Sequence, residues 1–133
     1  MRFPVILALC VLPFGLLTPI LEISPTHVFN PDWPGHARLH VAWQLATNSA
    51  LALLCVWLAW RRGKARLAAT IALIVTGGFL FAFALSRFYG GTMQHSDGSE
   101  LTIGGINVAV ALMTASAIGL AGLLAAKDKS AGP

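Results

Sequence analysis

Apolar residues fill four long runs of this chain, and polar residues gather between the runs. The runs cover about residues 3–22, 39–60, 67–88 and 103–126. The length of each run is close to the roughly 20 residues that an α-helix needs to cross about 30 Å of hydrocarbon. The strands of an outer-membrane barrel would alternate apolar and polar residues, and these runs do not. We therefore expect an all-α integral membrane protein, a four-helix bundle that forms one domain over residues 1–133.

Three prolines, Pro4, Pro13 and Pro19, interrupt the first run. We expect them to kink this helix, or to break its hydrogen-bond ladder where neighbouring helices can compensate. A basic start and an apolar centre are also typical of a signal peptide, but no small-x-small cleavage site follows. The first run is therefore expected to be retained as a membrane span.

Basic residues are distributed unevenly along the chain. Those near the termini or between the second and third runs are Arg2, Arg61, Arg62, Lys64, Arg66, Lys127 and Lys129. Only Arg38 and Arg87 lie near the other two loops. Because cytoplasmic loops carry an excess of Lys and Arg, we expect a multi-pass protein of the inner membrane with both termini in the cytoplasm. This topology, together with anionic lipid headgroups, accounts for the net charge of +4, so no nucleic-acid partner is expected.

A stripe of polar residues begins where the second run begins. His36 and His40 are four residues apart, and Gln44, Thr47 and Asn48 continue into the apolar stretch. At 100° per residue, the first four of these fall within an arc of roughly 80° on one helix face. Since lipid does not tolerate such a stripe, we expect it to face other helices or a cavity.

Histidines and acids near this stripe predict a site for acid–base chemistry. His36 or His40 beside Glu22 could move protons to and from a molecule dissolved in the membrane. The leading hypothesis is binding, or isomerase- or lyase-like conversion, of a small hydrophobic molecule or lipid, without a cofactor. The residues expected to contact this molecule are Trp33, Arg38, Trp43, Gln44, Asn48 and Asn107.

Two alternatives stay open. Histidines at i and i+4 can bind one metal ion, with His27, Glu22 or His95 as a third ligand. The zinc-protease motif is excluded, because Ala37 stands where that motif needs Glu. In the second alternative there is no enzyme activity. The stripe then makes interhelical hydrogen bonds in an accessory subunit or a homo-oligomer.

One segment resembles a known signature. The residues from Phe29 to His40 read Phe-Asn-Pro-Asp-Trp-Pro-Gly-His-Ala-Arg-Leu-His. They look like the pattern Phe-Asn-Pro-x-Trp-Pro-x-His-Ala-x-x-His of small, mostly uncharacterised four-span membrane proteins. More loosely, the architecture is similar to DoxX-like four-helix proteins and to sterol-isomerase-like membrane bundles. The resemblance implies four spans and assigns neither a reaction nor roles to residues.

The charge distribution predicts which segments are accessible from outside the cell. Cysteines placed at Thr26 and Ser96 should react with an impermeant thiol reagent in intact cells, and a cysteine at Gly63 should not. The unaltered chain is the control, because Cys10 and Cys55 both lie inside apolar runs. The reverse labelling pattern would overturn the expected orientation.

Overall fold

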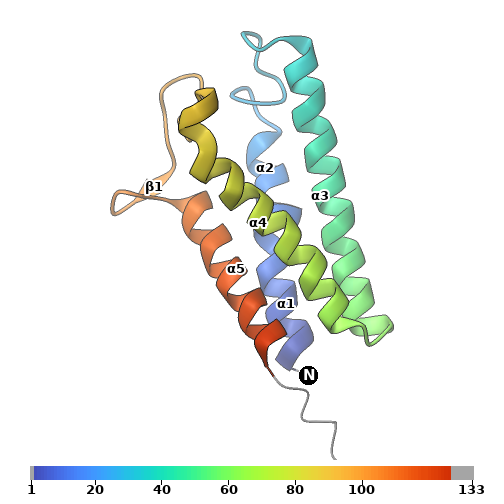
Figure 1. Cartoon of the computed structure of the whole chain (residues 1–133). Coiled ribbons are helices and arrows are strands. Elements are labelled where there is room, and N and C mark those ends of the chain that lie inside the picture. Colours follow the sequence, from blue (N-terminus) through green and yellow to red (C-terminus); the bar gives the residue numbers. More distant parts are fainter. Residues whose placement is uncertain (1, 127–133) are drawn as a thin grey trace, which may run out of the picture.

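The computed structural model describes residues 2–126. They form four long helical segments, and consecutive segments run in roughly opposite directions (Figure 1). The first segment is continuous but changes type along its length. It consists of α1 (Arg2–Leu12), the π-helix η1 (Pro13–Leu17) and α2 (Thr18–Glu22). The other helices are α3 (Gly35–Arg61), α4 (Ala65–Tyr89) and α5 (Val108–Ala125). The expected all-α fold with four helices is confirmed.

All four segments are long and apolar enough to cross a membrane. They comprise 20, 27, 25 and 18 residues, with mean hydropathies of 2.3, 1.5, 2.2 and 2.1 in chain order. The chain therefore has the composition of a multi-pass membrane protein. Lys127 and Lys129, which contribute to the expected charge bias, lie outside the described residues.

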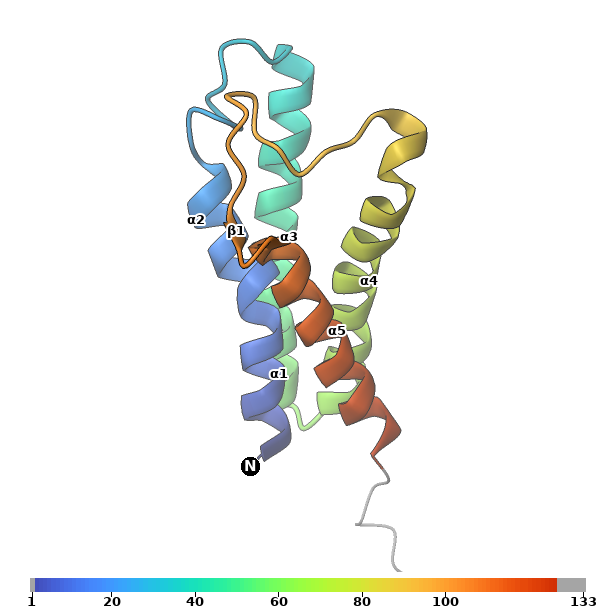
Figure 2. The same ribbon diagram turned by 90° about the vertical axis from the view of Figure 1, so that its left-hand side faces the viewer.

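The two ends of the bundle differ. The N-terminus and the short α3–α4 turn lie at one end, which we call the terminal end (Figure 1). Residues 23–34 and 90–101 form two long loops at the opposite end, which we call the loop end. Figure 2 shows the loop-end half of α4 leaning away from α2 and α3. In agreement, no residue of α4 beyond Thr76 is buried, and the core lies mainly in the terminal half of the bundle.

Small residues let the helices approach closely in that core. Ala68, Ala69 and Ala72 of α4 are fully buried, and the Cys55 thiol of α3 donates a hydrogen bond to the Ala68 carbonyl at 3.3 Å. Leu7, Phe14 and Leu120 fill the space between these helices and the first and last segments. Side-chain packing of this kind drives helix association where lipid replaces water.

The prolines of the first segment disturb its hydrogen bonds, as expected, and α3 compensates. Pro19 has no N–H group, so the Gly15 carbonyl loses the donor that an α-helix would supply four residues later. The Ser49 hydroxyl of α3 donates to that carbonyl at 3.0 Å. Two residues before Gly15, the Pro13 carbonyl accepts hydrogen bonds from both the backbone N–H and the hydroxyl of Thr18. These bonds keep the π-turn within the bundle.

The fourth span begins later than expected from the apolar run at 103–126. A small hairpin comes first, in which β1 (Thr102–Ile103) pairs with β2 (Ile106–Asn107). Gly104 and Gly105 have φ values of +60° and +79°, which are typical of the two central residues of a type I′ turn. α5 then starts at Val108, and the Asn107 side chain caps it by accepting a hydrogen bond from the Val110 N–H. The expected start at residue 103 is therefore wrong by five residues.

The contact between the π-turn and α3 generates a stability prediction. A Cβ atom at Gly15 would collide with the Ala52 Cβ. Gly15→Ala should therefore destabilise the protein by about 1–3 kcal/mol, the usual cost of overpacking. Adding Ala52→Gly should recover part of that loss. Thermal unfolding in detergent measures both effects.

Gly77→Ala is the matched control, because a Cβ atom there would meet nothing within 4 Å. This variant should unfold at or above the Tm of the unaltered protein. An equal Tm for Gly15→Ala and the unaltered protein would contradict the close contact.

Candidate functional site

The first loop folds back over the end of α2. Its prolines, Pro25, Pro31 and Pro34, prevent a regular helix. The Val28 N–H donates to the Glu22 carbonyl at 3.2 Å, which closes the chain into a compact turn. This turn brings the His27 side chain onto Glu22.

Glu22 and His27 form the only salt-bridge contact in residues 2–126 of the structure. The His27 Nε2 atom lies 3.0 Å from Oε2 of Glu22, and its Nδ1 atom lies 2.9 Å from the Thr26 hydroxyl. The exposed fractions of the two side chains are 15% for His27 and 28% for Glu22. Both imidazole nitrogens therefore have a partner, and a proton can be shared between Glu22 and His27.

Two more aromatic rings surround His27. The His95 ring from the second loop lies edge-on with a centroid separation of 5.0 Å, and the Trp33 ring lies edge-on at 5.5 Å. Burial lowers the pKa of His27, and the neighbouring His95 lowers it further. Both effects favour the neutral form of the His27 imidazole.

Asn30 joins the two loops from a fully enclosed position. Its side chain is 1% exposed, and its amide nitrogen donates to the Ser96 hydroxyl at 2.8 Å and to the Thr26 carbonyl at 3.1 Å. Its amide oxygen accepts a hydrogen bond from the Asp32 N–H at 2.9 Å. The sequence pattern Asn-Pro-Asp indicates a turn here, but it contains no signal for the contact with residue 96.

The second loop is ordered by its own side chains. The Asp97 carboxylate accepts hydrogen bonds from the backbone N–H and the hydroxyl of Ser99, at 2.9 and 2.6 Å. These bonds lower the pKa of Asp97. The Ser99 hydroxyl also lies 3.0 Å from Nδ1 of His95, which orients that ring.

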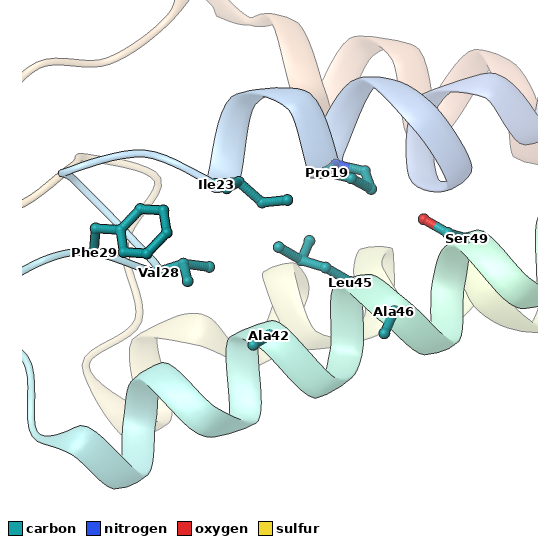
Figure 3. A pocket seen from close by; sticks show the side chains of 8 residues that line it. All are labelled: Pro19, Ile23, Val28, Phe29, Ala42, Leu45, Ala46 and Ser49. Carbon is teal, nitrogen blue, oxygen red and sulfur yellow. The ribbon is translucent and has the colours of Figure 1, made fainter.

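An apolar pocket of about 370 Å³ lies between α2, the first loop and α3 (Figure 3). Its lining comes from α2, the first loop and one face of α3, and consists of Pro19, Ile23, Val28, Phe29, Ala42, Leu45, Ala46 and Ser49. The Ser49 hydroxyl hydrogen is already donated to the Gly15 carbonyl. Ile23 and Val28 directly follow Glu22 and His27 in the chain, so the polar pair adjoins the pocket wall.

His36 and His40 form a separate pair. Their Nε2 atoms are 3.0 Å apart, both residues are exposed, and the Trp43 ring lies 6.0 Å from the His40 ring. Neither contacts Glu22, whose partner in the structure is His27. His27 also does not lie with His36 and His40 as a third metal ligand. Within residues 2–126, no group of three or more His, Cys, Asp or Glu side chains could hold one.

The rest of the polar stripe is largely uncovered. Gln44 and Thr47 are exposed and Asn48 is half-buried, so most of the stripe is not covered within the chain, and the expectation that it faces other helices or a cavity stays a prediction. Gln44 lies eleven residues before Cys55, which places both side chains within about 20° on the helix. Cys55 contacts α4, whereas Gln44 belongs to the loop-end half of α3. The loop-end half of α4 leans away from α3 (Figure 2).

The remaining predicted contact residues are dispersed. Trp33 is the one that joins the Glu22–His27 pair. The Arg38 guanidinium folds back toward Gly35, and Asn107 is occupied by capping α5 and by donating to the Glu100 carboxylate at 3.0 Å.

The chain matches no protein-family model, no curated protein and no solved structure.

The environment of His27 predicts how stability depends on pH. Because its pKa is lowered in the folded state, the unfolded chain binds more protons in the range below the ordinary histidine pKa of about 6.5. The contribution of His27 to stability should therefore fall as the pH is reduced from 7.5 to 5.5. His27→Gln should reduce this dependence. Urea unfolding monitored at several pH values measures it.

His36→Gln is the control, because His36 is exposed and lies outside this cluster. It should retain the pH dependence of the unaltered protein. A His27→Gln variant with an unchanged dependence would show that His27 does not carry the effect.

Proposed function

We propose that this protein binds a small hydrophobic molecule from the membrane in the apolar pocket between α2 and α3. Ligand pockets typically enclose about 300–1,000 Å³ and combine apolar walls with a few polar groups. The pocket volume of about 370 Å³ falls in this range and suits a small molecule or part of a lipid. Its place beside two membrane-length helices supports entry from the lipid phase.

The Glu22–His27 contact is the observation that carries the chemical part of this proposal. A carboxyl group and an imidazole 3.0 Å apart can together accept and return one proton. Acting on a C–H group next to a carbonyl or a double bond, the pair would remove the proton and return it to another carbon of the same molecule. This reaction is an isomerisation, because no atom is gained or lost.

His27 therefore takes the role that the sequence suggested for His36 and His40. His95 and Trp33 would hold the imidazole in place, and the Asn30 hydrogen bonds would keep the two loops together over the site. The charge bias supports an inner-membrane protein with cytoplasmic termini, so that this site faces outward.

The binding part is tested by filling the pocket. Ala46→Phe should remove lipophilic molecules that copurify with the protein, because the new ring occupies the pocket beside Leu45 and Ser49. Solvent extraction followed by mass spectrometry identifies these molecules. Ala84→Phe, on the exposed loop-end half of α4, is the matched control and should leave them in place. Equal amounts in both variants would rule out this pocket.

The chemical part is tested in D2O. Molecules extracted from the unaltered protein after incubation in D2O should carry deuterium on carbon. Glu22→Gln and His27→Gln should bind the same molecules and incorporate at least about 100-fold less deuterium, the lower range for loss of a general base. If both variants incorporate as much deuterium as the unaltered protein, the pair has no acid–base activity, and the protein is a binding protein or an accessory subunit.

A further inference from the structure

His36 and His40 present two imidazole nitrogens at a spacing suited to a metal ion. Their Nε2 atoms are 3.0 Å apart, and the ring centroids are 4.5 Å apart. Both side chains are exposed in the first two turns of α3, so an ion can reach them. The helix backbone fixes the spacing, since residues i and i+4 lie one above the other on the same face.

The distance indicates which coordination geometry fits. With metal–nitrogen bonds of about 2.0–2.1 Å, two nitrogens 3.0 Å apart subtend an angle of about 94° at the metal. This angle is close to the cis angle of about 90° in square-planar and octahedral sites. Tetrahedral zinc, with an angle of about 109°, would need the nitrogens to lie about 3.3 Å apart.

We propose that His36 and His40 form a bidentate site for Cu²⁺, and that the same site binds Ni²⁺ more weakly. Square-planar nitrogen and oxygen ligation is typical of these two ions, and Cu²⁺ binds most tightly among the divalent first-row metals. The metal takes the place of the hydrogen bond between the two Nε2 atoms, and each neutral ring then carries its hydrogen on Nδ1. Water fills the remaining positions, because no third His, Cys, Asp or Glu of residues 2–126 groups with them.

The helix face that carries the two histidines has no basic residue in its first three turns. The nearest basic residue along the helix is Arg38, which lies about 160° around the helix from each histidine. On the other side, Trp43 places its ring 6.0 Å from the His40 ring, close enough to report a bound paramagnetic ion. The site is independent of the Glu22–His27 pair and of the pocket.

The test is Cu²⁺ binding to the full-length protein in lipid nanodiscs. Electron paramagnetic resonance of the Cu²⁺ complex should show hyperfine coupling to two imidazole nitrogens. His36→Gln and His40→Gln should each remove one nitrogen and weaken binding by more than about tenfold. His27→Gln and His95→Gln are the matched controls and should leave the spectrum unchanged. A two-nitrogen spectrum that persists in both the His36→Gln and the His40→Gln variants would overturn the proposal.

Fluorescence gives a second readout. Cu²⁺ should quench part of the tryptophan emission, and Trp43→Phe should remove that part without changing the two-nitrogen spectrum. Quenching of the same size in the Trp43→Phe variant would place the ion elsewhere. His36, His40 and Trp43 are exposed, so substitutions at these three positions should not alter the helical content. Circular dichroism measures that content.

Discussion

The contact between the π-turn of the first segment and α3 is the constraint on which the loop end depends. Pro19 leaves the Gly15 carbonyl without its helical donor, and Ser49 supplies one from α3. Gly15 can lie against Ala52 because it has no Cβ atom. This contact sets the separation of α2 and α3, and therefore the floor of the pocket and the position of Glu22 above it.

Above that floor, the two loops assemble a polar cluster from residues far apart in the chain. Asn30 reaches Ser96 across 66 positions, and the His27 ring meets the His95 ring. An amide as enclosed as that of Asn30 must have hydrogen-bond partners, because an unpaired buried polar group costs about 1–3 kcal/mol. The loops are therefore linked by a polar contact, whereas the terminal half of the bundle is held by apolar packing.

Much of the helical framework could be predicted, because length and apolar content suffice to identify a membrane-length helix. The disturbance caused by Pro19 could be predicted as well, but not its repair by Ser49. The hairpin before α5 was missed, because Thr102–Ile103 and Ile106–Asn107 flank the glycine turn with apolar residues that extend the apolar run. Their strand pairing depends on the positive φ of Gly104 and Gly105, which hydropathy does not register.

The amino-acid sequence by itself determined the pairing of His36 with His40, because helical geometry brings residues four apart together whatever surrounds them. It also determined that Gln44 and Thr47 share that face. Only the tertiary structure decided what covers the face, because this depends on the direction of α4, which leans away beyond Thr76. Likewise, Glu22 meets His27 rather than His36 or His40, since the path of a loop, not helical periodicity, brings them together.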